Sequence, residues 1–366
     1  MNVPFIDLSQ TTAAVKDVYL ERVTSLLEKN RFILTEEVAQ FEQEWAEYLE
    51  IAHAIGVSNG SDALYLSLLA LGIGPGDEVI TQGNAYNASV VAILRTGATP
   101  RFVDIVPNTL TMNPELIAGC ITHKTKAILV VHLFGQPCDI QSVRSIADAH
   151  KLFLVEDCAQ SHGAMYAGKH TGAWGDIAAF SFYPTKNLGA FGDAGAVVTH
   201  RADLAERVIR LRNLGSVKKN NHEILGFNMR LDPMQAIVLS LKIPFLKEWT
   251  NMRKVAAQRY STLLADAGVG EILQGLPNGT HVYHLYVIHV NRRDAVKAAL
   301  LAKGVQTEIH YPIPVYRQPF FGECADACPV TDASAERLLS LPMFPHITAE
   351  QQEYVVAQLR NTIITK

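Results

Sequence analysis

The chain has 366 residues, of which 48% are hydrophobic and 19% are charged, and its formal net charge is −4. This size and apolar content suit a globular protein with one large and one smaller domain, and the charge gives no electrostatic case for binding nucleic acid or a membrane surface. The N-terminus lacks the pattern of a secretory signal, and apolar runs such as residues 127–131 are too short to cross a bilayer. Five irregularly spaced cysteines favour reduced thiols in the cytoplasm, and Cys324 and Cys328 lack the further ligands of a zinc site.

In chain order, apolar residues at helical spacing predict two N-terminal helices, and short apolar strands then alternate with further helices. The expected helices span residues 15–27, 38–49, 62–71, 88–95 and 140–150, and the expected strands span residues 54–57, 78–81, 101–105, 127–131, 152–155 and 178–182. The first two helices are expected to pack in the core or between subunits. The alternation predicts a doubly wound, mainly parallel α/β sheet.

The second half of the chain indicates a smaller α+β unit. A long helical pattern that begins at Pro233 is interrupted at Pro244. We therefore predict a large domain over residues 1–244 and a small domain over residues 245–366, on which the N-terminal helices could also pack. Further strands are expected at residues 197–199, 282–290 and 305–310, and further helices at residues 204–214, 294–303 and 349–360.

Residues 55–64 follow the strand, turn and helix pattern of an anion-binding site. Gly60 lets the backbone approach a ligand closely, and Ser61 and Asp62 stand where the first N–H groups of a helix point outward. Those N–H groups and the helix dipole favour a phosphate. No Gly-Lys-Ser/Thr follows, so the segment is not a Walker loop, and Ser61 or Asp62 could equally be only a helix cap.

Two carboxylates, Glu156 and Asp157, directly follow the apolar run 152–155. They stand at the carboxyl end of a predicted strand, which is the edge where open α/β sheets bind ligands. A carboxylate there could ligate a metal, act as a general base or pair with a protonated ring nitrogen, and a capping Asp is the ordinary alternative. His162 alone adds too little for a metal site, so no metal is expected.

Lys186 follows the apolar strand 178–182 and the break at Pro184, and a glycine-rich segment comes next. A lysine directly after a core strand is partly desolvated, which lowers its pKa and frees the amine to attack carbonyls. The ordinary alternative is a lysine that extends from a loop into water.

Residues 60–62, Asp157 and Lys186 together meet the needs of pyridoxal 5'-phosphate (PLP). The phosphate of PLP suits a helix N-terminus, its pyridinium nitrogen suits an anion, and its aldehyde needs an amine. An aspartate beside the pyridine nitrogen keeps that nitrogen protonated, so the ring can accept carbanion electrons. We therefore expect a PLP enzyme.

Six segments carry a resemblance that extends over most of the chain. They are residues 60–64 (GSDAL), 131–137 (VHLFGQP), 156–160 (EDCAQ), 181–189 (SFYPTKNLG), 226–232 (GFNMRLD) and 340–343 (SLPM). They resemble, in the same order, the signature segments of the fold-type I, PLP-dependent sugar-nucleotide aminotransferases. The resemblance implies an aspartate-aminotransferase-like fold and a homodimer with shared active sites.

Position by position, the resemblance implies that Lys186 binds the cofactor aldehyde and later moves protons. Asp157 would pair with the pyridine nitrogen, Gln160 would hydrogen-bond the ring hydroxyl, and Tyr86 would stack on the ring. Without the resemblance, Tyr86 could be an ordinary core aromatic residue.

The resemblance also implies which residues hold the cofactor phosphate. They would be Gly60, Ser61, Asp62 and Ser181, with Asn228 reaching the phosphate from the partner subunit. Taken alone, Ser181 could be an ordinary strand serine and Asn228 an ordinary turn residue.

The implied reaction moves an amino group from L-glutamate to a keto-sugar carried on a nucleoside diphosphate. Residues 161–163, 283–287 and 308–316 are similar to the subgroup that acts on dTDP-linked 3-keto-6-deoxyhexoses and forms dTDP-3-amino-3,6-dideoxyhexoses. A 4-keto aminotransferase on the same scaffold is the main alternative. Residues 82–84 and Asn220 depart from the pattern of the family, which leaves the sugar and nucleotide contacts open.

The candidate substrate contacts are His162, Tyr183, Lys219, His310 and Tyr311. Lys219 is a candidate for the diphosphate of the substrate, and Tyr183, His310 and Tyr311 are candidates for the sugar. Lys219 could equally lie in a solvated basic turn, and His162 could be an ordinary buried histidine.

Three other functions are less well supported by the sequence. Sugar dehydratases of the same superfamily carry histidine at the position of Lys186, and a non-catalytic regulator on this fold would be expected to have lost Lys186 or Asp157. A nicotinamide oxidoreductase would need a Gly-x-Gly-x-x-Gly turn after the first strand, which residues 56–60 do not supply.

Overall fold

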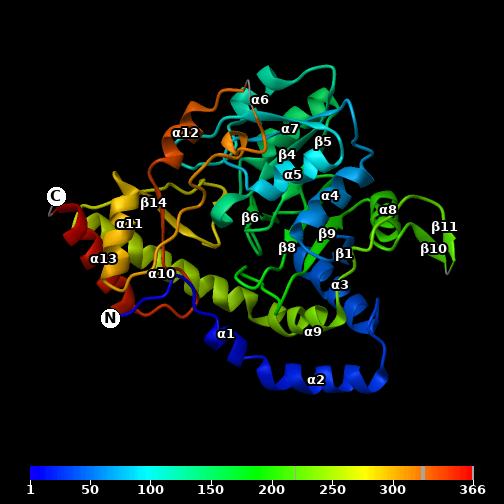
Figure 1. Cartoon of the computed structure of the whole chain (residues 1–366), viewed down its shortest axis with the longest axis horizontal. Helices are drawn as coiled ribbons and strands as arrows, with labels where there is room; N and C mark the ends of the chain where they lie inside the picture. Colours follow the sequence, from blue (N-terminus) through cyan, green and yellow to red (C-terminus); the bar gives the residue numbers. More distant parts are fainter. Residues whose placement is uncertain (219, 323–325, 365–366) are drawn as a thin grey trace.

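The computed structural model describes residues 1–218, 220–322 and 326–364. Its centre is a seven-stranded sheet with the order β1-β9-β8-β5-β4-β2-β3 (Figure 1). The strands are β1 (His53–Val57), β2 (Glu78–Gln82), β3 (Thr99–Val103), β4 (Thr125–Val131), β5 (Phe153–Asp157), β8 (Ile177–Ser181) and β9 (Gly195–Thr199). β9 runs antiparallel to β1 and β8, and the other neighbours are parallel. The predicted mainly parallel sheet is confirmed.

Helices bury both faces of this sheet. Alternate residues of β4 point to opposite sides, so Leu129 joins the hydrophobic cluster of α4 and α8 whereas Ile128 joins that of α6 and α7. A third cluster joins α3 and α9 to β8 and β9. The helices are α3 (Glu36–Leu49), α4 (Gly60–Ala70), α5 (Asn87–Arg95), α6 (Pro114–Cys120), α7 (Ile140–His150), α8 (Ala202–Arg212) and α9 (Pro233–Lys242). Burial on both faces explains why the strands are continuous apolar runs.

The helix starts follow from local side-chain chemistry. The Asn59 side chain accepts a hydrogen bond from the Asp62 N–H at 2.8 Å and so caps α4. α6, which the sequence analysis missed, begins the same way: Asn113 accepts from the Glu115 N–H at 3.1 Å, and Pro114 occupies the first turn.

The C-terminal part forms a second, smaller unit around an antiparallel sheet of β12 (Glu271–Ile272), β14 (Tyr286–His289) and β15 (Leu338–Leu341). Helices α10 (Leu246–Ala267), α11 (Arg293–Ala302) and α13 (Ala349–Ile364) pack on it. The predicted strand 282–290 is correct only for residues 286–289, because the preceding segment turns at Tyr283, where φ is +47°. The strand predicted at residues 305–310 is wrong: Val305 and Glu308 each form a single isolated bridge, to Val3 and Ser340.

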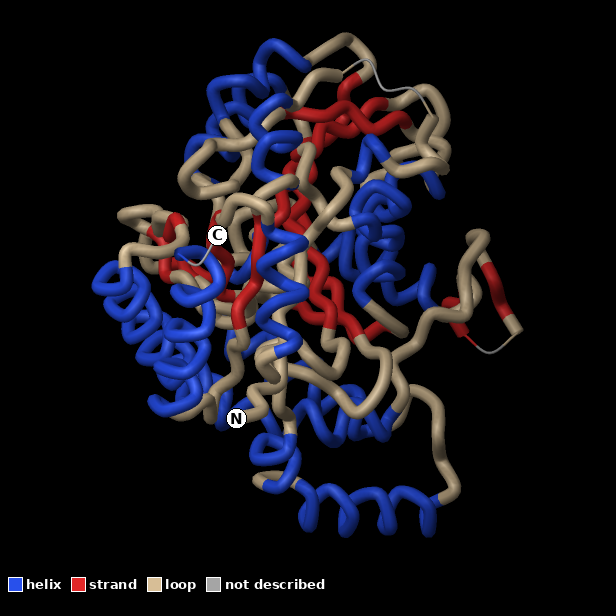
Figure 2. The backbone as a smooth tube through the Cα atoms, turned by 60° about the vertical axis from the view of Figure 1, so that its left-hand side comes forward, coloured by secondary structure: helices blue, strands red, loops and turns tan. Residues whose placement is uncertain are grey.

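The N-terminal helices α1 (Ser9–Ala13) and α2 (Lys16–Lys29) lead into α3. Both α2 and α3 contact α9 of the large unit, whereas Val3, which precedes α1, pairs with the small unit. In Figure 2, α2 lies below the rest of the molecule. The 3₁₀-helix η2 (Ile243–Phe245) joins α9 to α10, and the proposed domain boundary at residue 244 lies within it.

The remaining elements are short. They are β6 (Met165–Tyr166), β7 (Lys169–His170), β10 (Ser216–Lys218), β11 (Asn221–His222), β13 (Gly279–Thr280), η1 (Leu133–Gly135), η3 (Val315–Arg317) and α12 (Pro329–Ala335). β10 and β11 project from the large unit in both views (Figures 1 and 2). None of the described helices is long and apolar enough to cross a lipid bilayer.

Candidate active site

A cavity of about 590 Å³ lies at the carboxyl edge of the large sheet, against the small unit. The residues that follow β1, β5 and β8 line this cavity, because these three strands run in the same direction and end at the same edge. Eleven residues predicted for the site line this cavity: Gly60, Ser61, Asp62, Tyr86, Asp157, Gln160, Ser181, Tyr183, Lys186, His310 and Tyr311. Segments up to 251 residues apart in the chain, from Gly60 to Tyr311, therefore meet at one site.

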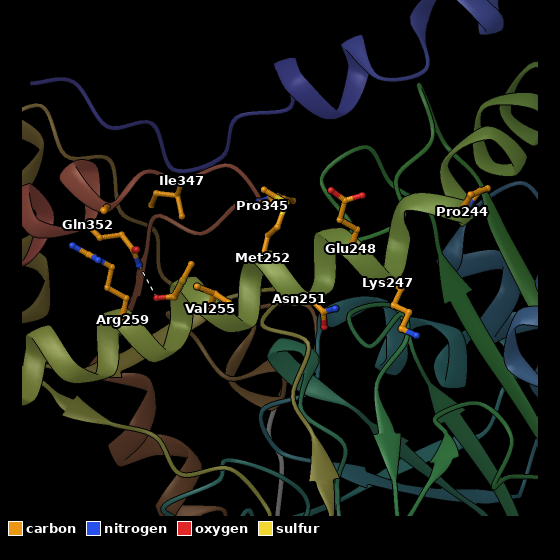
Figure 3. A pocket seen from close by; sticks show the side chains of 12 residues that line it. Pro244, Lys247, Glu248, Asn251, Met252, Val255, Arg259, Pro345, Ile347 and Gln352 are labelled. Carbon is orange, nitrogen blue, oxygen red and sulfur yellow. Dashed lines mark hydrogen bonds between the residues drawn. The ribbon is translucent and has the colours of Figure 1, made fainter.

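A larger groove of about 700 Å³ lies along α10, between that helix and the segment around Pro345 (Figure 3). Lys247, Arg259 and Glu248 line this groove, but it shares no lining residue with the cavity at the edge where β5 and β8 end. We therefore place the cofactor in the smaller cavity, which holds the predicted lysine and aspartate together.

The N-terminus of α4 forms one end of the cavity. The N–H groups of Gly60 and Ser61 belong to the first helical turn and have no intrahelical acceptor. The Asp62 carboxylate accepts hydrogen bonds from the Ser58 hydroxyl at 2.6 Å and from the Asn59 amide at 2.9 Å, and it pairs with Arg95. Asp62 therefore stabilises the turn with its side chain and leaves the N–H groups ahead of it open to an anion.

Gly60 and Ser181 lie in direct contact across this end of the cavity. A Cβ placed on Gly60 would come within 2.5 Å of the Ser181 Cβ, so only glycine fits there. The contact places the Ser181 hydroxyl, which accepts a hydrogen bond from the Tyr183 N–H at 3.3 Å, beside the helix N-terminus. The two segments predicted to hold a phosphate are thus adjacent.

Asp157 lies at the end of β5, with 3% of its surface exposed. Its carboxylate accepts hydrogen bonds from the Ser89 hydroxyl at 2.7 Å and from the Ala159 N–H at 3.0 Å. Burial raises the pKa of Asp157, and the two hydrogen bonds and the charge of Lys186 partly offset the increase. A buried carboxylate of this kind is stabilised further by a cationic ring nitrogen.

Lys186 lies in the turn after β8, and its amine has no hydrogen-bonding partner among the residues that the structure describes. Burial lowers the pKa of Lys186 to about 8, and the charge of Asp157 acts in the opposite direction. The free amine that attack on an aldehyde requires is therefore more populated near neutral pH than it is for an ordinary lysine.

The turn that carries Lys186 is tightly constrained. The Lys186 N–H donates to the Tyr183 carbonyl at 2.8 Å, and a Cβ on Gly189 would come within 2.2 Å of the Pro184 carbonyl oxygen. From α9, the Lys242 ammonium donates to the Gly189 carbonyl at 2.7 Å. These contacts fix the backbone on both sides of the reactive amine.

Gln160, Tyr311 and Tyr86 form one wall of the cavity. The Gln160 side chain accepts from the Phe134 N–H at 2.6 Å and donates to the Tyr311 hydroxyl at 3.0 Å. The rings of Tyr311 and Tyr86 have centroids 5.0 Å apart, and Tyr86 is 48% exposed. The exposed Tyr86 ring is accessible to a flat aromatic ligand.

His310 and Tyr183 also line the cavity. The His310 Nδ1 and the Ser340 hydroxyl are 2.9 Å apart, and burial lowers the pKa of His310 to about 4, so the ring is neutral. Tyr183 comes shortly before Lys186 in the chain, and its side chain is 53% exposed. Both remain candidates for substrate contacts.

Two predicted residues do not line the cavity. His162 is completely buried among Trp45, Phe180 and Phe182, and burial lowers its pKa to about 3. We therefore do not propose His162 as a substrate contact. Asn228 is exposed on the strand-like segment that pairs with Asn213.

The predictions for Lys219 and Cys324 fall outside the residues that the structure describes.

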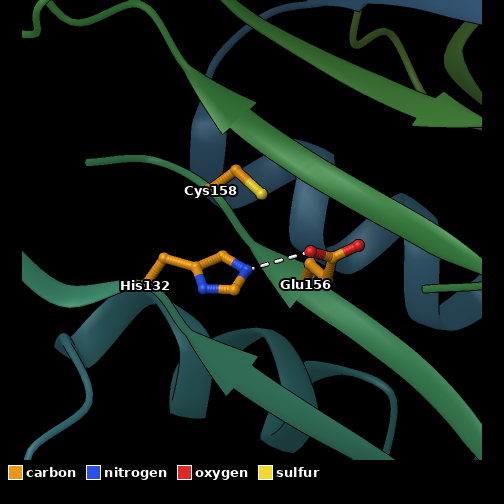
Figure 4. A group of neighbouring side chains, drawn as sticks. All are labelled: His132, Glu156 and Cys158. Carbon is orange, nitrogen blue, oxygen red and sulfur yellow. Dashed lines mark hydrogen bonds and ion pairs between the residues drawn. The ribbon is translucent and has the colours of Figure 1, made fainter. Parts of the chain in front are cut away.

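Glu156, the neighbour of Asp157, has a structural role. It lies close to His132 and Cys158, with ligand atoms within 4.8 Å of one another (Figure 4). The Glu156 carboxylate is already occupied: it accepts from His132 Nε2 at 2.9 Å and from three backbone N–H groups, those of Gly172, Trp174 and Gly175. A metal ion here would have to replace these hydrogen bonds. We therefore infer that the Glu156 carboxylate holds residues 172–175 against β5.

Ser89 and His284 contribute to the site, although the sequence predicted no role in it for either residue. Ser89 supports Asp157 from α5, and His284 lines the cavity from the small unit. The apolar pattern predicts a strand over residues 282–290, and nothing in that pattern indicates that His284 lines the cavity.

These residues fit PLP on structural grounds. The open helix N-terminus with Ser181 suits the phosphate, buried Asp157 suits the ring nitrogen, and the unpaired amine of Lys186 suits the aldehyde. The fold and the site together define the class of fold-type I PLP-dependent enzymes.

Residues 14–360 match the DegT/DnrJ/EryC1/StrS aminotransferase family, and the chain belongs to this family. The solved structure of Streptomyces venezuelae DesV in complex with a ketimine intermediate has a TM-score of 0.95 and is 42% identical, covering 98% of both chains. The aminotransferase activity, the PLP cofactor and the fold that the sequence predicts are thereby confirmed.

Three relatives illustrate the range of names in the family. A Streptomyces venezuelae protein, 43% identical over 98% of this chain and 95% of its own length, is named dTDP-3-amino-3,4,6-trideoxy-alpha-D-glucose transaminase. An Acidithiobacillus ferrooxidans protein, 42% identical over 99% and 98%, is named UDP-N-acetyl-3-dehydro-alpha-D-glucosamine 3-aminotransferase. A Geobacillus stearothermophilus protein, 42% identical over 98% of each chain, is named a pleiotropic regulatory protein.

The chemistry follows from where the side chains lie. PLP, when bound, supplies an electron-accepting ring on which an amino group can be exchanged. Asp157 would hold the ring nitrogen of PLP in its protonated form, and the first turn of α4 with Ser181 would hold the phosphate. Lys186 would move protons at the reacting carbon as a positioned acid and base, since its pKa of about 8 lets it accept and release a proton near neutral pH.

Proposed function

We propose that this protein transfers the amino group of L-glutamate to C3 of a dTDP-linked 3-keto-6-deoxyhexose, giving a dTDP-3-amino-3,6-dideoxyhexose. The observation that carries the proposal is the single cavity in which Lys186 and Asp157 meet beside the N-terminus of α4. The related sugar dehydratases carry histidine in place of this lysine, so Lys186 supports amino transfer.

The names of related proteins and the residues of one cavity wall support C3 as the aminated carbon and dTDP as the nucleotide. The Streptomyces venezuelae relative is named for a dTDP-linked 3-amino sugar, and the Acidithiobacillus ferrooxidans relative is also named for amination at C3. His310 and Tyr311, from the segment that resembles the 3-keto subgroup, line the cavity. A UDP-linked 3-keto sugar is the second candidate because of the Acidithiobacillus ferrooxidans relative, and a 4-keto sugar has no comparable support.

We further propose that the enzyme is a cytoplasmic homodimer with shared active sites. Val18, Leu20 and Leu27 of α2 are exposed apolar side chains, which suit burial against a second subunit. Asn228 is exposed outside the cavity, so its proposed contact is with the cofactor phosphate of the partner subunit. A sedimentation measurement on the holoenzyme tests the dimer, and a monomeric active enzyme would contradict it.

The test of the reaction supplies purified holoenzyme and L-glutamate with matched 3-keto and 4-keto sugars on dTDP and UDP. We expect product from the dTDP-linked 3-keto-6-deoxyhexose, with nitrogen on C3 by NMR. Lys186→Ala should give no product. Amination at C4 would contradict the proposed substrate, and the absence of amination with every sugar would favour a regulator, as the name of the Geobacillus stearothermophilus relative suggests.

A further inference from the structure

Two histidines, His310 and His284, line the cavity. The proposed function gives His284 no role. His284 lies between β13 and β14 in the small unit, is 5% exposed and lines the cavity that holds Lys186. Arg253 of α10 donates to the backbone carbonyls of Tyr283, His284 and Met343, at 3.1, 3.4 and 3.2 Å. The backbone at His284 is therefore held in place from α10.

The side chain of His284 is held by Asn187, the residue after Lys186. The Asn187 amide nitrogen donates to the Val282 carbonyl at 3.0 Å, which leaves its side-chain oxygen as the atom facing His284 Nδ1 at 3.3 Å. An amide oxygen can only accept, so Nδ1 carries the proton. The other ring nitrogen, Nε2, is then an acceptor, and it has no hydrogen-bonding partner among the described residues.

The ring remains neutral in this position. Burial lowers the pKa of His284, and the nearby positive charges of Lys186 and Arg253 lower it further. The site thus presents a neutral, fixed acceptor next to the reactive lysine, and an unpaired acceptor of this kind needs a donor when the cavity is filled and water is expelled.

We propose that His284 binds the keto-sugar: its Nε2 accepts a hydrogen bond from a hydroxyl on a carbon next to the reacting carbonyl. This inference rests on the proposed function. The carbonyl would have to reach the amino group that the cofactor carries beside Lys186, so its neighbouring hydroxyls would arrive beside the residues that flank Lys186. L-Glutamate has no hydroxyl, so the contact belongs to the sugar and separates the two substrates that share the cavity.

Two substitutions separate this contact from a structural role. In His284→Asn, the amide nitrogen lies near the position of Nδ1 and can still donate to Asn187, but the acceptor at Nε2 is lost. In His284→Gln, the amide reaches the position of Nε2 and can accept, but the hydrogen bond to Asn187 is lost. A purely structural histidine would therefore be replaced better by asparagine, and a sugar contact better by glutamine.

The first readout is the affinity of each holoenzyme for dTDP-3-amino-3,6-dideoxyglucose, measured by calorimetry. We expect His284→Asn to weaken binding about tenfold and His284→Gln to recover most of the loss. The second readout compares the two half-reactions, and the sugar half-reaction should slow at least tenfold more than the glutamate half-reaction. Binding to His284→Asn as tight as to wild type, or His284→Gln weaker than His284→Asn, would overturn the proposal.

Substrate analogues test the same contact in the wild-type protein, in case a variant does not fold. Sugars that lack the C2 or the C4 hydroxyl identify the donor: one of them should bind wild type about tenfold more weakly, and His284→Asn should no longer distinguish it from the parent sugar. Equal wild-type affinity for all three sugars would overturn the proposal. If wild type neither binds nor aminates any 3-keto sugar, the proposed function fails instead, and the analogue series is repeated with the keto-sugar that is accepted.

Discussion

The Ser89 hydroxyl on α5 donates a hydrogen bond to the Asp157 carboxylate at the end of β5, over a distance of 2.7 Å. Both side chains are buried, although 68 residues separate them in the chain. Burial alone would favour the neutral acid, and this hydrogen bond lowers the pKa of Asp157 against that effect. Ser89 thus favours the ionised form of the carboxylate and fixes its orientation at the end of β5, where it would meet the ring nitrogen of the cofactor.

Ser89→Ala should weaken cofactor binding. The substitution removes the donor, so the pKa of Asp157 rises and its pairing with a protonated ring nitrogen weakens by about 1–2 kcal/mol, a factor of roughly ten. Fluorescence titration of the apoenzyme with PLP measures the change, and Ser89→Thr, which keeps a hydroxyl, is the control. Unchanged affinity in Ser89→Ala would show that the Ala159 N–H is sufficient to hold Asp157.

Gly60→Ala should disturb the phosphate end of the site. The new methyl group would lie 2.5 Å from the Ser181 Cβ, and relief of that overlap costs about 1–3 kcal/mol and separates α4 from Ser181. We expect at least tenfold weaker binding of PLP in the same titration. Gly119→Ala in α6 is the matched control, because a Cβ there meets nothing within 4 Å. If PLP binding weakened equally in both variants, the overlap with Ser181 would not be the cause.

The reactivity of Lys186 in the apoenzyme should rise with a midpoint near pH 8. Burial lowers its pKa from 10.5 to about 8, so the amine is protonated and unreactive below that pH and free above it. Asp157→Asn removes a charge that raises this pKa, so the midpoint should move to lower pH. Labelling with an amine reagent, read at Lys186 by peptide mass spectrometry, gives both midpoints, and a wild-type midpoint near 10.5 would refute the expected desolvation.

Lys242→Met should loosen the turn that carries Lys186. The buried Lys242 ammonium donates to the Gly189 carbonyl, and methionine would leave that carbonyl without its donor at a cost of about 1–3 kcal/mol. Urea unfolding of the apoenzyme measures the free energy of unfolding. Lys247→Met, at an exposed lysine of α10, should change it by less than about 0.5 kcal/mol. Equal stability of the two variants would count against the role of Lys242.

The parts of the site that the sequence predicted are those set by local pattern. Asp157 and Lys186 each follow an apolar strand, and parallel strands carry their ends to one edge, so their meeting could be expected before the structure was known. The same pattern predicted the existence of α4 but not its exact start: the helix expected at residues 62–71 begins at Gly60, and its cap is Asn59 and not Ser61 or Asp62.

Contacts between distant segments could not be predicted in the same way. Ser89 reaches Asp157 from α5, a helix that packs on α4 and β3, and His284 reaches the cavity because the chain turns at Tyr283. The strand predicted at residues 305–310 failed for a related reason: apolar Val305 is buried by pairing with Val3 at the other end of the chain, not by a strand of its own. His162 was placed by a motif, whereas the aromatic residues around it decide where it packs.

The most direct measurement concerns the covalent bond at Lys186. Holoenzyme treated with borohydride and digested should yield one peptide heavier by a reduced pyridoxal phosphate group, with the modification on Lys186. The modified peptide should be absent from Lys186→Ala and should become scarce in Asp157→Asn at limiting PLP. A modification on any other lysine, or none in PLP-saturated wild type, would contradict the account.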